Sequence, residues 1–252
     1  MRIVIVLILL ILMPAFSCFS DESKLVTLTA IEYPPYTSQE LDNGGFLEDM
    51  AKSAFSLSGY EVEIIYLPWN RALEMTKRGS YDGLMDMWYR VEREEFFIFS
   101  EEMAASKIGL LKRKDNPATA ASYEELKAYR IGVVRGYANP PQFEAMHDQL
   151  QIDEADGEIT NLKKLLGKRV DFILMDLKVG RHLIKTFFGD KSHMLVALPW
   201  ILQNDPLHIG FSRKAMDIDA KVKAFNDGIK SLKASGEYQK ILERNGVQEV
   251  DE

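Results

Sequence analysis

Short apolar segments alternate with segments of helical period along most of the chain, and this alternation constrains the fold more than any other feature. The apolar segments are rich in β-branched residues and have the length of strands. They cover residues 25–31, 62–67, 83–87, 108–111, 131–134, 172–175, 194–198 and 207–211. Because alternating strands and helices usually form parallel sheets covered by helices, we predict an α/β protein with mostly parallel strands.

Helices are predicted where apolar residues recur every three or four positions between the strands. The clearest case ends before a glycine, and its apolar face consists of Leu47, Met50, Ala51, Ala54 and Phe55. Other helical segments cover residues 70–79, 162–166, 177–188 and 222–232. A further helix is expected to begin at Asn139, whose side chain can cap it, with Pro140 in the first turn.

Two extended stretches indicate that the chain builds two lobes. The charged, turn-forming residues 111–117 lie near the middle of the chain, and residues 207–213 form a second extended segment. We expect the chain to leave the first lobe at about residue 113 and to return near residue 208. The predicted division is 21–113 plus 207–252 for lobe 1 and 114–206 for lobe 2.

Residues 1–20 have the layout of a signal peptide. Met1 and Arg2 precede an apolar run from residue 3 to residue 13, which is followed by small residues. This run is shorter than the ~20 residues that a membrane-spanning helix needs. We therefore expect export to the periplasm, with cleavage before Cys18 or shortly after Ser20. Attachment of a lipid to Cys18 is the alternative to a free, soluble product.

Composition and motif content exclude several classes of function. The formal net charge is -7 and the positive charges are scattered, whereas a nucleic-acid-binding face needs clustered basic residues. The chain has 1 cysteine, which rules out a disulfide framework and a thiolate metal cluster. The histidines lack the spacing of metal ligands, and no phosphate-binding loop or serine-nucleophile motif occurs. We expect no metal, no cofactor, no nucleic-acid partner and no catalysis.

Aromatic and charged residues follow the predicted strands at the points where they end. In open α/β sheets, ligands bind outside the carboxyl ends of the strands. The recurrence of aromatic residues at these ends therefore predicts a pocket. The segments concerned are 32–36, 68–71, 88–90 and 135–137, together with Asp176.

The order and spacing of several short motifs carry a family resemblance. The motifs are YPPY at 33–36, GFLEDMA at 45–51, YDG at 81–83, Glu92-Arg93 followed by Phe99-Ser100, IGVVRG ending at Gly136, the segment 170–176, and the segment 224–236 with Ile241. From residue 25 to about 247 the chain resembles the bacterial extracellular solute-binding protein family 3, the periplasmic receptors of polar amino-acid ABC transporters. The resemblance implies a two-lobed periplasmic-binding-protein fold of type II. Each lobe is then a mixed sheet flanked by helices, and two hinge strands join the lobes around the ligand.

The resemblance also implies roles for individual residues. Arg93, six residues before Phe99, matches the arginine that binds the ligand α-carboxylate, which a guanidinium can grip with two parallel hydrogen bonds. Asp176 matches the acidic residue that binds the α-ammonium group, and Tyr33 matches the aromatic residue that packs on the ligand. Gly136 and the residues after it would offer backbone N–H groups at a helix start. A surface ion pair with a neighbouring glutamate is the alternative for Arg93.

The chain departs from the family pattern at two places. Residues 86–90 and 137–138 lack the small hydroxyl residues that most members use to bind the carboxylate, and the first segment is one residue shorter than usual. Trp69 and Arg71 add bulk and another guanidinium, although Arg71 can equally face solvent. The remaining candidate ligand residues are Tyr36, Trp88, Tyr89 and Tyr137. Because aromatic faces attract cations, we expect a ligand with a flat or cationic part.

These observations together predict a monomeric periplasmic solute-binding protein. It would capture an amino acid or amino-acid-like ligand by hinge closure and present it to the membrane permease of an ABC transporter. Two alternatives stay open. A periplasmic sensor could read the same closed form, and a dehydratase-like enzyme on this fold could use Glu32 or Asp86 as an acid or base.

Overall fold

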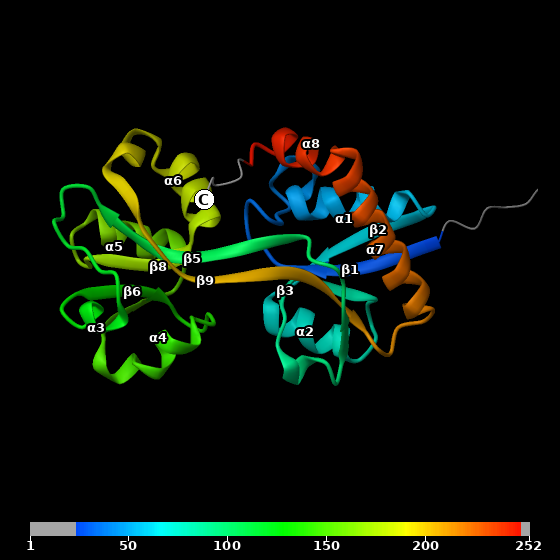
Figure 1. The fold of residues 1–252 in the computed structure, drawn as a ribbon, viewed down its shortest axis with the longest axis horizontal. Coiled ribbons are helices and arrows are strands. Elements are labelled where there is room, and N and C mark those ends of the chain that lie inside the picture. The colour runs from blue at the N-terminus through cyan, green and yellow to red at the C-terminus, as the bar shows by residue number, and fades with distance from the viewer. Residues whose placement is uncertain (1–23, 248–252) are drawn as a thin grey trace, which may run out of the picture.

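The computed structural model describes residues 24–247, which form two halves connected by a pair of long strands (Figure 1). These strands are β5 (Ala104–Arg113) and β9 (Leu195–Ser212), which pair antiparallel. They join both halves into one sheet of order β2-β1-β3-β9-β5-β8-β6-β7, with β4 also paired to β9. The predicted α/β class, with mixed sheets flanked by helices, is confirmed.

The first half contains the N-terminal strands and both C-terminal helices. Strand β1 lies parallel to β2 and β3, and β3 and β4 run antiparallel to β9. The strands are β1 (Lys24–Ala30), β2 (Tyr60–Tyr66), β3 (Gly83–Trp88) and β4 (Phe97–Phe99). The helices are η1 (Asp42–Gly44), α1 (Phe46–Ser56), α2 (Trp69–Lys77), η2 (Val91–Arg93), α7 (Ile218–Ser235) and α8 (Glu237–Arg244).

The second half is built on strands that lie parallel to one another and antiparallel to β5. Strand β6 pairs with β7 and β8 in parallel, and β8 pairs with β5. The strands are β6 (Arg130–Val134), β7 (Gln151–Ala155) and β8 (Phe172–Asp176). The helices are α3 (Tyr123–Leu126), α4 (Pro141–Ala145), η3 (His147–Gln149), α5 (Glu158–Leu166), α6 (Leu177–Phe187) and η4 (Gly189–Met194).

Helix α1 shows how the local pattern produces the core. The whole apolar face predicted for it is buried, together with Phe46 at its start. The helix packs against α7, and the two backbones approach closely because residue 228 is a glycine. A Cβ atom placed on Gly228 would lie 2.3 Å from the carbonyl oxygen of Ala54. The period of the sequence therefore selects the buried face, and one small residue sets how near the partner helix can come.

The structure corrects two expectations about local structure. The helix expected at Asn139 begins at Pro141, and Pro140 occupies the capping position without a side-chain hydrogen bond. Asn139 instead donates a hydrogen bond to Glu144. The strands expected at 194–198 and 207–211 are the two ends of the continuous strand β9. Because β9 pairs antiparallel with three strands, the sheet is less parallel than predicted.

The predicted boundary at residue 113 lies at the far end of β5. Arg113 is buried there, and its guanidinium donates to the carbonyl of Leu165 in the second half at 2.8 Å. The crossing between the halves occupies the other end of β5, where Ala104 pairs with Leu207. The division of the chain into lobes stays a prediction, and the predicted signal peptide at 1–20 lies outside the described residues.

Between residues 24 and 247, none of the helices combines the length and the apolar character needed to cross a membrane.

Candidate functional site

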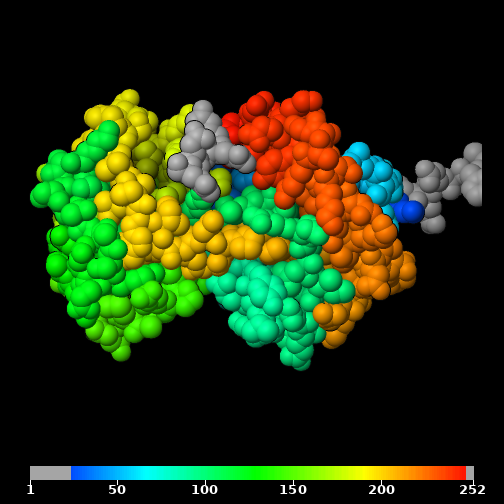
Figure 2. Space-filling model, in the orientation of Figure 1, coloured from blue at the N-terminus to red at the C-terminus, as the bar shows by residue number. Residues whose placement is uncertain are grey.

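A cavity of about 440 Å³ lies between the two halves, against the crossing strand β9. The first half contributes Trp69, Asp86, Trp88 and Arg93 to its walls, and the second half contributes residues 135–138. Figure 2 shows the surface hollowed between the two halves, below the crossing strands. A volume of this size is within the range of ~300–1,000 Å³ usual for sites that bind small molecules.

The aromatic wall of the cavity comes from three neighbouring strand ends. Strands β1, β2 and β3 are parallel neighbours, so their carboxyl ends meet at one edge of the sheet. Tyr33 follows β1, Trp69 follows β2 at the start of α2, and Trp88 is the last residue of β3. All three side chains line the cavity. The sheet topology thus gathers aromatic residues that are far apart in the sequence.

Arg93 supplies the cationic side of the cavity. It ends η2, and its Nη1 donates to the carbonyl oxygen of Trp88 at 2.8 Å. Its guanidinium carbon lies 5.3 Å from the ring centre of Trp69, a distance typical of a cation–π contact. No ion pair to Arg93 occurs within residues 24–247, and Glu94 accepts a hydrogen bond from Tyr89 instead. Most N–H donors of this guanidinium are therefore available to a ligand.

Asp86 lies in the same cavity in an unusual backbone conformation. Its φ is 59°, in the left-handed region that non-glycine residues rarely adopt. The side chain is only 7% exposed, and its Oδ2 lies 2.6 Å from the hydroxyl of Thr37. Its Oδ1 has no hydrogen-bond partner among the described residues. Burial, assisted by the negative charge of Glu48, raises the pKa of Asp86 to about 7.

Asp176 lies at the end of β8, where the sequence places it, but its carboxylate is already occupied. Its Oδ1 accepts hydrogen bonds from the backbone N–H groups of Lys178 and Val179, so the residue caps α6. Its Oδ2 accepts from the hydroxyls of Ser106 at 2.7 Å and Tyr36 at 2.9 Å. Burial raises the pKa of Asp176, and these hydrogen bonds act in the opposite direction. A carboxylate has about four acceptor positions, so little capacity is left for a ligand.

Tyr36 bridges the two halves rather than lining the cavity. Its ring is fully buried and stacks on Tyr33 with ring centres 5.3 Å apart. Its hydroxyl lies 2.9 Å from Asp176 and 3.3 Å from the carbonyl oxygen of Ala105 at the crossing. Burial, and to a lesser degree the charge of Asp176, raises the pKa of Tyr36 well above its usual value. Tyr36 therefore ties the first half to β5 and β8 behind the cavity.

The loop after β6 forms the opposite wall. Gly136 has φ 77° and turns the chain, and Tyr137 follows it half-exposed on the cavity surface. Burial, followed by the negative charge of Glu158, raises the pKa of Tyr137 above its usual value. A smaller pocket of about 40 Å³ adjoins the cavity here and is lined by Tyr33, Tyr137 and Asp176. Tyr137 therefore faces the tryptophan wall from the second half.

Besides Tyr36 and Asp176, two more residues predicted for the site lie outside the lining of this cavity. Arg71 is exposed in the first turn of α2, the alternative considered from the sequence. Tyr89 is 43% exposed, and its hydroxyl donates to Glu94 at 2.8 Å. Among the predicted residues, those that line the cavity are Tyr33, Trp69, Trp88, Arg93, Gly136 and Tyr137.

Asp86 and Arg135 line the cavity without having been predicted as ligand-binding residues. Both lie at the carboxyl end of a strand, which is the positional signal that could have identified them. Arg135 already pairs with Glu154 at 2.9 Å and with Asp156 at 2.7 Å. From the sequence, Asp86 is interpreted as a polar residue of the pocket or as a candidate acid or base. Its burial without a partner is visible only in the structure.

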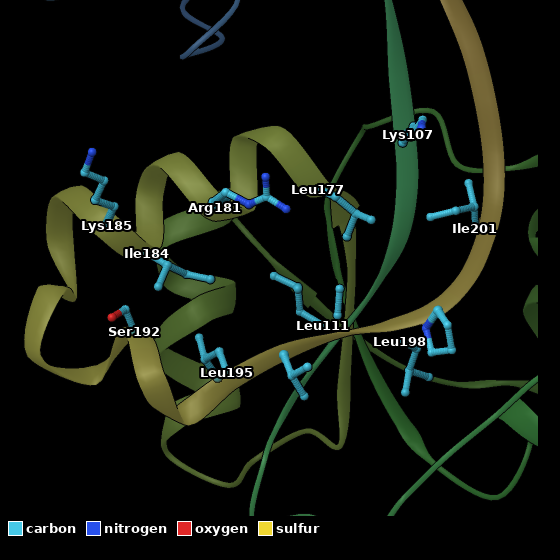
Figure 3. A pocket seen from close by; sticks show the side chains of 13 residues that line it. Lys107, Leu111, Leu177, Arg181, Ile184, Lys185, Ser192, Leu195, Leu198 and Ile201 are labelled. Atoms are coloured by element: carbon cyan, nitrogen blue, oxygen red, sulfur yellow. The ribbon is translucent and has the colours of Figure 1, made fainter. Parts of the chain in front are cut away.

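A second cavity, of about 640 Å³, lies in the second half of the molecule (Figure 3). Apolar side chains of β5, α6 and β9 form most of its lining. Three basic residues, Lys107, Arg181 and Lys185, also line it. It contains none of the residues predicted to bind a ligand. Within residues 24–247, no group of His, Cys, Asp or Glu side chains is arranged to hold a metal ion.

Comparison with known proteins gives consistent matches over nearly the whole chain. The chain is 22% identical over 245 residues to the ABC transporter arginine-binding protein 1 of Escherichia coli, covering 94% of this chain and 97% of that protein. An L-arginine-bound amino acid ABC transporter substrate-binding protein from Streptococcus pneumoniae shares the fold, with 23% identity, coverage of 90% and 96%, and a TM-score of 0.69. So does an ancestral amino acid-binding protein described as a precursor of cyclohexadienyl dehydratase, with 20% identity, coverage of 87% and 94%, and a TM-score of 0.69. The model of the bacterial extracellular solute-binding proteins, family 3, matches residues 25–248, and the chain belongs to this family.

Proposed function

We propose that this chain binds an amino acid or amino-acid-like ligand in the cavity between its halves and delivers it to the permease of an ABC transporter. The observation that carries this proposal is the guanidinium of Arg93, which lines the cavity and forms no ion pair with any residue from 24 to 247. A partly buried cation of this kind is a strong site for a carboxylate. Two of the similar proteins, one named as arginine-binding and one with L-arginine bound, support an amino acid as the ligand.

Hinge closure is the mechanism that this geometry favours. The cavity walls come from different halves, so a change of the angle between the halves alters the distance from Arg93 to the loop after β6. At the crossing, β9 contains Pro206 opposite Ala105, and proline cannot donate a hydrogen bond to the neighbouring strand. A ligand that contacts both walls stabilises the closed form over the open one.

We further propose that the protein is exported to the periplasm, acts as a monomer and does not convert its ligand. Membership of a family of solute-binding proteins supports binding as the basic activity. The structural likeness to a dehydratase precursor makes conversion of the ligand the main alternative. Recovery of the bound compound unchanged after incubation is the outcome that agrees with pure binding.

The test is a thermal-shift screen of residues 21–252 against amino acids, amines, organic acids and small peptides. A ligand at 100 times its Kd stabilises the folded protein by ~2.7 kcal/mol, which a melting curve detects easily. Arg93→Ala should reduce the shift given by a carboxylate ligand, whereas Arg71→Ala should retain it, because Arg71 lies outside the cavity. The proposal is wrong if no small molecule raises the melting temperature, or if the compound is recovered chemically altered.

A further inference from the structure

We propose that Asp86 is the anionic anchor of the cleft, binding a positively charged nitrogen of the ligand within the aromatic wall, while Arg93 binds the ligand's carboxylate. This inference rests on the proposed ligand-binding function of the cavity and specifies its chemistry. A carboxylate at this place would make the site selective for amines, guanidines and zwitterions over purely anionic compounds. Asp86 would then bind the cationic nitrogen of the ligand, a role for which the sequence favours Asp176.

The backbone of β3 is distorted at the point where Asp86 occurs. The pairing of β3 with β9 shifts register between Leu84 and Met87, so an extra residue is accommodated there. Asp86 takes up the distortion in the left-handed conformation, at φ 59°. This conformation is unfavourable for a residue that carries a Cβ atom. Bulges of this kind redirect a side chain and are frequent beside binding sites.

The carboxyl group of Asp86 is incompletely hydrogen-bonded by the residues that the structure describes. The hydroxyl of Thr37 lies 2.6 Å from Asp86 Oδ2 and 2.9 Å from the carbonyl oxygen of Ile31. A hydroxyl has a single hydrogen, so it can donate to only one of these acceptors. If it donates to Ile31, Asp86 has to carry a proton and donate to Thr37. If it donates to Asp86, the carboxylate is charged and Oδ1 still lacks a partner.

The neighbouring charged groups favour a cation beside Asp86. Glu48 of α1 adds negative charge and is itself bonded to Lys52 at 2.6 Å and to the hydroxyl of Tyr66 at 2.7 Å. The nearby phenols of Tyr33, Tyr36 and Tyr66 add no charge near pH 7, and burial raises the pKa of each further above its ordinary value. The imidazole of His208, opposite Met87 on β9, is directed to the carbonyl oxygen of Ser100. Two arginines line the cavity with Asp86: Arg93 from the same half, and Arg135 from the second half, which is paired with Glu154 and Asp156.

Asp176 is the other buried carboxylate near the cleft, and its environment differs. Its oxygens accept hydrogen bonds from Lys178, Val179, Ser106 and Tyr36. Binding a ligand ammonium group there would displace donors that also cap α6. Asp86 Oδ1 has no hydrogen-bond partner in the part of the chain that the structure describes, so a cation could bind there without displacing a donor, and Asp86 is the better anchor.

The test compares ligand binding by the wild type and by Asp86→Asn at pH 6 and pH 8. Probes are the L-amino acids except histidine, together with agmatine, putrescine, glycine betaine and dicarboxylic acids, and titration calorimetry follows the thermal-shift screen. We expect the compounds that bind the wild type to carry a cationic nitrogen. Their affinity should fall at least tenfold in Asp86→Asn at pH 8. Arg93→Ala, as the matched control, should weaken carboxylate-bearing probes and spare agmatine and putrescine.

The pH dependence tests the wild type without any substitution. If the ligand binds the charged carboxylate, a pKa of about 7 makes the competent fraction about ten times larger at pH 8 than at pH 6. We therefore expect affinity to rise about tenfold over this range. Equal affinity at both pH values, or binding by Asp86→Asn within threefold of the wild type, would overturn the assignment of Asp86 alone. Absence of binding by every probe would overturn the proposed function as well.

Discussion

Replacing Asp86 by asparagine should stabilise the ligand-free protein at pH 8. The buried carboxyl group has its pKa raised from 3.8 to about 7, so the folded protein disfavours its charged form. Each pKa unit corresponds to about 1.36 kcal/mol, which gives a destabilisation of about 4 kcal/mol once the group is ionised. Asparagine avoids this cost and can donate from its amide to Thr37, as the protonated carboxyl group would. We expect a net gain of about 2–4 kcal/mol, since the left-handed backbone conformation is retained.

The sign of the pH dependence follows from linkage. The unfolded chain releases the proton of Asp86 near its ordinary pKa of 3.8, whereas the folded protein holds it up to about pH 7. The contribution of Asp86 to the stability of the wild type is therefore fully present below about pH 4 and is lost as the pH rises to about 7. The difference between Asp86→Asn and the wild type should be near zero at pH 4 and largest at pH 8.

Urea unfolding followed by tryptophan fluorescence measures this difference. With a denaturant slope of about 2–3 kcal/mol/M, the midpoint at pH 8 should increase by about 1 M. The same variant should bind cationic probes more weakly, so stability and binding would change in opposite directions, as at sites strained for function. If Asp86→Asn is no more stable than the wild type at pH 8, the buried carboxylate of Asp86 does not destabilise the folded protein.

Three further predictions follow from the contacts around the cavity and the core. Asp176→Asn should destabilise the protein by about 1–3 kcal/mol in urea unfolding, because the amide nitrogen cannot accept the hydrogen bonds that the carboxylate accepts; unchanged stability would contradict this role. Arg93→Ala should weaken a carboxylate ligand by about 10-fold to 100-fold in calorimetry, and a loss within threefold would refute the carboxylate assignment. Gly228→Ala should lower the melting temperature, at a cost of about 1–3 kcal/mol, because the new Cβ would lie 2.3 Å from the carbonyl oxygen of Ala54; an unchanged melting temperature would mean that α1 and α7 separate easily.

The local elements could be predicted from the sequence because their signals are local. The apolar face of α1 repeats with the helical period, and every residue predicted to be on it is buried. The motif order from residue 25 onward likewise identified the family that the comparison confirms. The continuity of β9 was not predictable in the same way. Its middle, residues 199–206, begins and ends with proline and contains the polar run 203–205, and it is extended because it pairs with β5 across the two halves.

The candidate site shows where sequence reasoning reaches its limit. Strand ends correctly indicated where Tyr33, Trp69 and Trp88 would gather, since parallel strands present their carboxyl ends at one edge. Whether the side chain of Arg71 faces the cavity or solvent depends on how α2 is rotated about its axis. The few residues of its first turn do not reveal this rotation. Tyr36 resembles a ligand residue in sequence, yet its hydroxyl is used by Asp176 on the other half.

The sequence by itself determined the α/β class, the family and the strand ends that carry the cavity, because these depend on hydrophobic period and motif order within short stretches. The tertiary structure alone decided which carboxylate is satisfied and which is not. Asp176 meets donors from β5, α6 and the loop after β1, so both of its carboxylate oxygens are already hydrogen-bonded. Asp86 meets one hydroxyl in a bulge created by pairing with β9. Hydrogen-bond partners that come from distant segments are not encoded in any local pattern, and they determine which side chain is left for a ligand.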